Sequence, residues 1–231
     1  MRLVVRTLSE LCLTVGTLTV LFVVYVLHWT GIQARDAGAG RIDTLQREWA
    51  AASTTARTGP EGSPGPAAGP GPLPYVPGEG LAVMYVPRLG ADWKWPVLEG
   101  TGPSVLREGL GHYAATARLG ATGNFSVAGH RRTHGDPFKD FPRLRPGDAV
   151  VLTDGTTWFT YRVDRGPYRT VPTDVGVVAP LPRKSGYAGP GRYLTLTTCD
   201  PEWGSSHRLV VWAHLDSTAP AADGLPPALA G

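Results

Sequence analysis

Two stretches in the C-terminal third of the chain decide the fold: RYLTLTTCDP (residues 192–201) and RLVVWAHL (residues 208–215). Both are rich in β-branched and aromatic residues, which favour strands. The first run ends at Cys199, and the second opens with Arg208 after a short loop. Because consecutive antiparallel strands place the start of the second beside the end of the first, we expect Cys199 and Arg208 to face one rim of a sheet.

Segments of the same kind extend this strand pattern upstream, so one domain is expected over residues 81–216. The segments are short and separated by Gly and Pro, which is typical of an all-β barrel or sandwich. Short helical turns are expected at 104–111 and 138–144, and the Ala-, Pro- and Gly-rich tail 217–231 is expected to be disordered. The segments are LAVMYVPRL (81–89), DWKWPVLE (92–99), NFSVAGH (124–130), DAVVLTD (148–154), TTWFTYRV (156–163) and VPTDVGVV (171–178).

An apolar run near the N-terminus, LCLTVGTLTVLFVVYVLHW (residues 11–29), is long enough to cross a lipid bilayer. As a helix it spans about 28 Å at 1.5 Å per residue. A cleaved signal peptide usually has a shorter apolar region, so we favour an uncleaved single-pass transmembrane helix. Because Arg2 and Arg6 precede the run, the positive-inside rule predicts a cytoplasmic segment at 1–10 and everything after Thr30 outside the cell.

Residues 30–80 connect this run to the strand-rich domain. Ile42, Leu45 and Trp49 recur at helical spacing, which predicts a short juxtamembrane helix. The stretch GPEGSPGPAAGPGPLPYVPGEG (59–80) is mostly Gly and Pro and cannot bury a core. We therefore expect an extended spacer that holds the domain away from the lipid.

The bulk composition limits the partners. At 231 residues the chain allows one ordinary domain plus accessory segments. Its formal net charge is +3, and its arginines are scattered through the chain instead of forming the dense basic block that a phosphate backbone attracts. Nucleic acid is therefore not expected as a partner.

A thiol outside the cell that has no disulfide partner is at risk of oxidation, so its presence suggests a functional role. The chain has two cysteines, and Cys12 lies in the apolar run, so it cannot pair with Cys199. A thiol attacks only as the thiolate, which needs a nearby base or cation. His130, at the end of a predicted strand, can hold and return the proton, and Arg208 can stabilise an oxyanion. For each residue alone, an inert structural role stays the alternative.

The same side chains could instead form a metal site. His130 and His134 lie four residues apart, which on a helix would give two zinc ligands, with Cys199 as a third. However, Gly135 and Pro137 disfavour a helix there, and no glutamate completes an HExxH site. We therefore expect neither a metal nor a cofactor.

Four motifs taken together resemble the sortase family, and most closely the class E sortases of high-GC Gram-positive bacteria. The resemblance covers about residues 80–215. It implies an eight-stranded β-barrel with short helices, preceded by the transmembrane helix. The motifs are GLGHYAAT (109–116), GNFSVAGHR (123–131), the PF-x-x-F-x-x-L run (137–144) and TLTTCDP (195–201).

The resemblance implies a cysteine transpeptidase, that is, a thiol peptidase and acyltransferase. Such an enzyme cleaves a C-terminal LAxTG- or LPxTG-like sorting signal between Thr and Gly through a thioacyl intermediate. His130, Cys199 and Arg208 match the catalytic triad, Thr198 matches a residue whose backbone lies near the oxyanion, and Tyr113 matches a tyrosine associated with LAxTG-type signals. The implied partners are secreted proteins that carry the signal, and an amine of a peptidoglycan precursor or a pilin.

Two positions depart from the family pattern and leave the shape of the substrate groove open. Leu119 stands where the family usually has proline, and His134 replaces a residue that is commonly tyrosine. L,D-transpeptidases also use Cys and His, but the Leu-Thr-Thr before Cys199 does not resemble their Ser/Thr-His-Gly-Cys motif. A surface-anchored β-barrel binding module with an inert cysteine is the alternative function.

Overall fold

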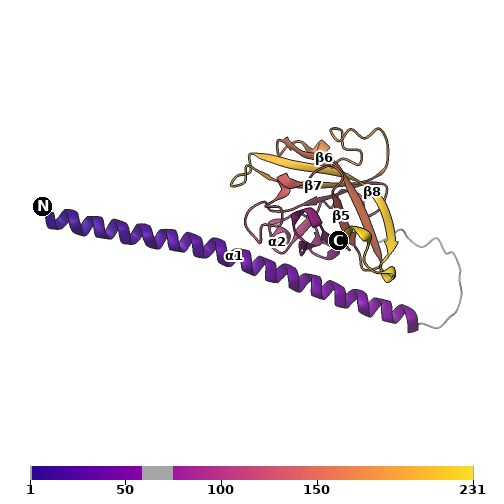
Figure 1. The fold of residues 1–231 in the computed structure, drawn as a ribbon, viewed down its shortest axis with the longest axis horizontal. Coiled ribbons are helices and arrows are strands. Elements are labelled where there is room, and N and C mark those ends of the chain that lie inside the picture. Colours follow the sequence, from indigo (N-terminus) through magenta and orange to yellow (C-terminus); the bar gives the residue numbers. More distant parts are fainter. Residues whose placement is uncertain (1, 59–74, 231) are drawn as a thin grey trace.

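The computed structural model describes residues 2–58 and 75–230, which form one long helix and one β-barrel (Figure 1). Helix α1 (Arg2–Thr58) leads the chain. The barrel is closed and has eight strands in the order β1-β2-β3-β4-β7-β8-β6-β5, which confirms the predicted fold. Most of the expected Gly/Pro spacer, residues 59–74, lies outside the described residues.

The strand bounds follow the predicted segments closely in most places. The strands are β1 (Gly80–Tyr85), β2 (Lys94–Glu99), β3 (Leu110–His112), β4 (Gly123–Ala128), β5 (Ala149–Thr153), β6 (Thr157–Thr170), β7 (Arg192–Asp200) and β8 (His207–Pro220). The connections carry helix α2 (Pro103–Leu106) and the 3₁₀ turns η1 (Pro87–Leu89), η2 (Phe141–Arg143) and η3 (Val175–Val178), and the tail after β8 carries η4 (Ala221–Asp223) and η5 (Pro227–Leu229).

The segment VPTDVGVV, which was expected to be a strand, contains the 3₁₀ turn η3 instead. Pro172 has no N–H to give to a ladder. Val177 packs on Val210 and Trp212, and its carbonyl accepts the indole N–H of Trp212 at 3.0 Å. These β-branched residues therefore cover the outer face of β8 and do not join the sheet.

Two other boundaries differ from the expectation. The helical turns predicted at 104–111 and 138–144 are present as α2 and η2, but residues 110–111 belong to strand β3, because Gly111 allows close backbone contact: a Cβ there would lie 2.4 Å from the Gly100 carbonyl oxygen. The tail was expected to be disordered from residue 217, but residues 217–220 belong to β8 and pair with 157–160 of β6. Strand β6 is long enough for residues 217–220 to pair with its first residues.

The core follows the period-two alternation of the strands. Side chains of alternate residues on β4, β7 and β8 fill the barrel, among them Phe125, Leu196 and Val211. The intervening residues point outward, and Trp212 is buried on that outer face beneath η3. This alternation decides on which face of the sheet each residue at the strand ends lies.

The C-terminal half of α1 docks on the barrel beside β1 and β2 (Figure 1). Ile42 and Leu45 are buried against Val83, with Trp49 packed beside them. Arg41 adds an ion pair to Glu108 at 3.0 Å. The predicted helical spacing of Ile42, Leu45 and Trp49 is thus present, but on one continuous helix and not on a separate short one.

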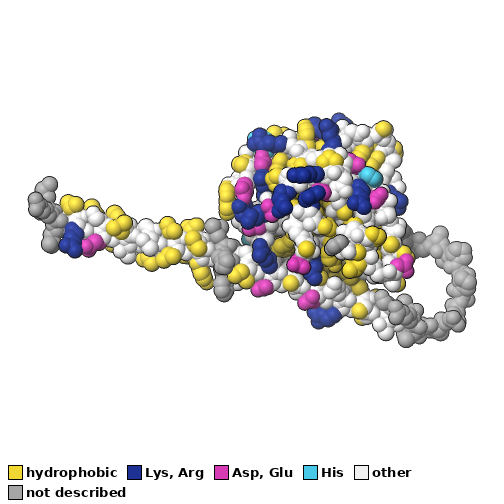
Figure 2. Space-filling view, viewed as in Figure 1, with side chains coloured by type: hydrophobic (Ala, Val, Ile, Leu, Met, Phe, Trp, Pro, Cys, Tyr) yellow, Lys and Arg dark blue, Asp and Glu magenta, His cyan; other side chains and the backbone are white. Residues whose placement is uncertain are grey.

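The N-terminal part of α1 is exposed and apolar (Figure 2). Among the described residues, Val4–Tyr25 is the segment whose length and composition would allow it to cross a membrane. Ala34, which is buried against the rest of the chain, comes nine residues after Tyr25, or about 14 Å along the helix. The distance between the barrel and the apolar segment is therefore set by α1, not by the Gly/Pro spacer as the sequence suggested.

Candidate active site

Strand register brings the three predicted catalytic residues to one rim of the barrel. Cys199 on β7 lies directly opposite Arg208 on β8. Strand β4 runs parallel to β7, with Ala128 beside Thr197, so His130 follows at the level of Cys199. The expectation that Cys199 and Arg208 lie side by side at one edge is therefore met.

Hydrogen bonds extend the pairing of β4 and β7 to this rim. The Gly129 N–H donates to the Thr197 carbonyl at 3.1 Å. The Thr198 hydroxyl, which is buried, donates to the Gly129 carbonyl at 2.8 Å. The backbone immediately before His130 is thus tied to the backbone immediately before Cys199.

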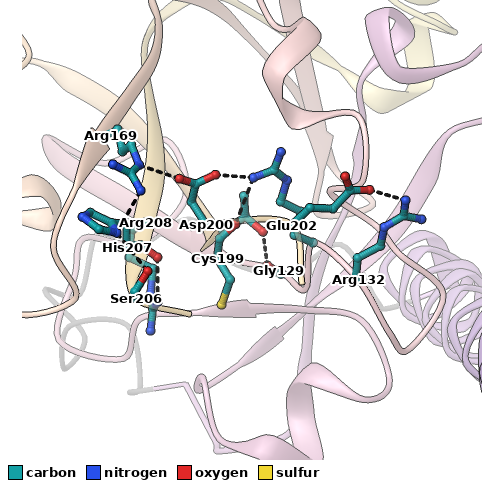
Figure 3. Close-up of polar contacts among 11 residues, drawn as sticks. Gly129, Arg132, Arg169, Cys199, Asp200, Glu202, Ser206, His207 and Arg208 are labelled. Carbon is teal, nitrogen blue, oxygen red and sulfur yellow. Dashed lines mark hydrogen bonds and ion pairs between the residues drawn. The ribbon is translucent and has the colours of Figure 1, made fainter. Parts of the chain in front are cut away.

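The side chain of Cys199 lies on the outer face of the sheet, by the alternation along β7. It is half-buried, and Figure 3 shows its sulfur pointing away from the carboxylate of the next residue, Asp200. Thr197 shares the outer face, and its hydroxyl lies 3.0 Å from the Tyr113 hydroxyl. Tyr113 therefore contacts the same face of β7 as the thiol, at Thr197, two residues before Cys199.

The imidazole of His130 is half-buried beside that of His134, with ring centroids 4.9 Å apart. Burial and then the charge of His134 lower the pKa of His130. The pKa of His134 is also lowered, by burial and by the charge of Arg107. Near neutral pH the neutral form of both rings is therefore favoured.

The guanidinium of Arg208 is held by backbone carbonyls at the start of β8. Its Nη1 donates to the carbonyl oxygens of Ser205 and His207, both at 2.9 Å. Among the described residues its hydrogen bonds involve Nη1 alone, so Nε and Nη2 can donate to a bound oxygen. The backbone thus orients a cation next to the thiol.

Behind this rim lies a charged cluster that the sequence analysis missed (Figure 3). Asp200 accepts hydrogen bonds from Arg131 at 2.5 Å and from Arg169 at 2.6 Å. Arg132 pairs with Glu202 beside it. Burial alone would raise the pKa of Asp200, but the hydrogen bonds from Arg169 and Arg131 outweigh it and hold this pKa below its usual value.

A second polar cluster supports the turn that carries Tyr113. His112 is buried, its Nδ1 lies 2.6 Å from Glu99, and its Nε2 lies 3.0 Å from the Thr116 hydroxyl. Its ring stacks on Phe125 with centroids 4.5 Å apart. The buried His112 ring and its partners thus fix the backbone next to Tyr113.

The candidate residues lie outside the hollow beside α1, and no metal-ligand cluster is found in the described part of the chain. Within residues 2–58 and 75–230 no group of three or more His, Cys, Asp or Glu side chains is arranged to hold a metal ion. A hollow of about 550 Å³ lies between α1 and the barrel, lined in part by Trp93, Trp95 and Asp136. Cys199 and His130 are not among its lining residues.

Comparison with known proteins gives consistent matches over the barrel and beyond it. The sortase domain family matches residues 84–216. Sortase SrtE1 of Streptomyces coelicolor is 38% identical over 97% of this chain, although the chain spans only 60% of that relative's length. Sortase SrtE2 of the same organism is 32% identical over 93% of this chain and 83% of its own.

Solved structures of sortases also match the chain. Sortase E from Streptomyces avermitilis is 71% identical, covers 67% of this chain and 99% of its own, and superposes with a TM-score of 0.64. Sortase E1 from S. coelicolor, solved with a tripeptide in the active site, is 40% identical at the same coverage, with a TM-score of 0.63. The resemblance read from the four sequence motifs is therefore confirmed, and the chain belongs to the sortase family.

Proposed function

We propose that the chain is a membrane-anchored cysteine transpeptidase that cleaves a sorting signal and transfers the upstream protein to an amine. The observation that carries the proposal is the cross-strand pair of Cys199 and Arg208, with His130 arriving at the same level from the parallel strand β4. Nucleophile, cation and proton carrier thus come from three neighbouring strand ends, which gives them a rigid common base.

The first half-reaction forms a thioacyl enzyme. The Cys199 thiolate attacks the carbonyl carbon of the signal's threonine, and the C–N bond to the following glycine breaks. Before the attack, neutral His130 takes the proton of the Cys199 thiol, and the imidazolium so formed gives this proton to the departing glycine amine. The Arg208 guanidinium and the backbone N–H near Thr198 stabilise the oxyanion of the tetrahedral intermediate.

The second half-reaction reverses these steps with another amine. The acceptor amine attacks the thioester carbonyl, His130 takes its proton, and the C–S bond breaks to release the Cys199 thiolate. We propose an amine of a peptidoglycan precursor or of a pilin as the acceptor, because family members use these. The proton that His130 took from the amine then returns to Cys199, so the neutral imidazole and the thiol present at the start are restored.

We further propose that Tyr113 contributes to recognition of an LAxTG-type signal. Its hydroxyl bonds Thr197 on the same face as the thiol, which supports contact with residues of a bound peptide. The S. coelicolor relative solved with a tripeptide in its active site supports a short peptide as ligand. Replacing Tyr113 with Phe should change the ratio of kcat/KM for LAxTG over LPxTG peptides.

Anchoring is the last part of the proposal. The exposed apolar segment Val4–Tyr25, preceded by Arg2, supports a single span with a cytoplasmic N-terminus and an extracellular barrel. Docking of α1 then fixes the distance between the barrel and the membrane.

The test uses the full chain purified in detergent, incubated with LAxTG or LPxTG peptides and a small amine. Mass spectrometry should detect the amide product and a thioacyl adduct on Cys199, and Cys199→Ala should give neither. Iodoacetamide should label Cys199 rapidly in the folded protein, whereas the inert cysteine of a binding module would react slowly. Turnover by the Cys199→Ala variant would refute the proposal.

A further inference from the structure

We infer that Asp200 is a positioning residue, whose carboxylate holds the chain neighbours of all three candidate catalytic residues in one cluster. The inference rests on the proposed roles of Cys199, His130 and Arg208. Asp200 does not take part in the chemistry, because it lies on the opposite face of β7 from the thiol (Figure 3).

Two arginines from different elements meet on this carboxylate. One oxygen accepts the Arg131 Nη1–H at 2.5 Å, and the other accepts the Arg169 Nε–H at 2.6 Å. The Asp200 side chain is 16% exposed and that of Arg131 is 11% exposed, whereas Arg169 is 55% exposed. Charge-assisted hydrogen bonds with little exposure fix geometry more strongly than surface pairs do.

Each contact leads to a residue next to a candidate catalytic group. Arg131 directly follows His130, and its Nη1 also lies 3.5 Å from the Cys199 carbonyl oxygen. Arg169 on β6 donates to His207 Nδ1 at 3.0 Å, and His207 directly precedes Arg208.

The same contacts explain how the ends of four strands are held together. His207 lies opposite Asp200 in the ladder of β7 and β8, and Thr170, next to Arg169, lies opposite Arg208. At the rim the regular ladder ends, so backbone hydrogen bonds alone no longer fix the relative positions of the strands. The Asp200 cluster supplies side-chain contacts at that point.

The cluster on the other side of the sheet from the thiol carries a net positive charge. A lone carboxylate one residue from Cys199 would oppose ionisation of the thiol. Two guanidinium groups pair with it, so the three side chains together carry one net positive charge. Arg132 and Glu202 beside them form a neutral pair.

The experiment compares Asp200→Asn and Arg169→Gln in the full chain, with Asp216→Asn as the matched control. Asp216 accepts a hydrogen bond from Arg162 at 3.1 Å, far from this rim on β8. The measurements are kcat and KM for peptide and amine, the melting temperature, and the rate of iodoacetamide alkylation against pH.

Both cluster variants should lower kcat by about tenfold to a hundredfold with little change in KM, because small displacements of catalytic groups carry such costs. The half-maximal pH of alkylation should move down in Asp200→Asn, which loses a negative charge, and up in Arg169→Gln, which loses a positive one. Asp200→Glu should restore the alkylation profile of the wild type, and Asp216→Asn should match the wild type throughout.

The half-maximal pH of alkylation should shift in opposite directions in the two variants. A general loss of stability would not shift it, so this readout separates a role in positioning and charge from a loss of stability. Wild-type kcat in Asp200→Asn, or alkylation shifts of the same sign in both variants, would overturn the inference. Should Asp200→Asn fail to fold, the exposed Arg169→Gln alone decides by the same two readouts. If Cys199→Ala is inactive while Asp200→Asn keeps wild-type kcat, this inference fails and the proposed function stands.

Discussion

Leu45→Ala tests whether α1 docks on the barrel in solution. The Leu45 side chain is only 5% exposed and packs with Ile42 against Val83. Burial of a leucine side chain contributes roughly 1.5–3 kcal/mol, and leucine-to-alanine changes at packed sites cost about 2–5 kcal/mol. The contact lies between a helix and the outside of a barrel, where the gap can partly close, so we take the lower end, about 2 kcal/mol.

A loss of this size shifts the docking equilibrium toward the detached helix by about thirtyfold. Hydrogen exchange followed by mass spectrometry should show the corresponding loss of protection in peptides covering residues 36–50 of α1. Barrel strands β7 and β8 should keep their protection, because the barrel core does not include Leu45. The matched control is Leu225→Ala, the same change at a side chain that is 65% exposed. Unchanged protection of residues 36–50 in Leu45→Ala would refute the docking argument.

Three further substitutions test the proposed roles at the rim. Arg208→Lys should lower kcat/KM by about tenfold or more in the peptide assay, because a point charge does not replace the planar fork of donors; full activity would show the oxyanion role to be wrong. Cys199→Ser should leave almost no thioacyl or ester adduct in mass spectra, since a hydroxyl is hard to ionise, and a rate near that of the wild type would contradict this. His134→Gln removes a charge that lowers the pKa of His130, so this pKa rises and the inflection of kcat/KM that reports it should move to higher pH; an unmoved inflection would argue against the pair.

The part of the site that could be predicted from the sequence is the part that depends on strand ends. Cys199 closes one β-favouring run and Arg208 opens the next, so hairpin geometry alone predicted their contact. The parallel pairing of β4 with β7 could not be predicted in this way, because the two strands are separated by more than sixty residues. Its position at the end of a predicted strand made His130 a candidate, and the family resemblance then matched it to a triad with Cys199 and Arg208.

The cluster around Asp200 could not be predicted from the sequence for a related reason. Two arginines after a histidine look like a polar turn, and an aspartate before a proline looks like the end of a strand. Arg131 and Arg169 meet at Asp200 because the ends of β4, β6 and β7 lie at one rim, and only the closed barrel order brings these ends together. A usable signal was present, however, since opposite charges stand immediately after both His130 and Cys199.

The docking of α1 changes what the Gly/Pro spacer can do. A flexible or semi-rigid spacer alone would let the barrel sample many heights and orientations above a membrane. A continuous helix fixes both, since each residue adds 1.5 Å of rise and about 100° of rotation. If α1 spans the membrane as proposed, Ala34 enters the barrel contact about 14 Å beyond Tyr25, so α1 fixes the height of the barrel above the membrane. The spacer joins the end of α1 to a barrel that α1 already contacts, so its length does not set the reach of the catalytic rim.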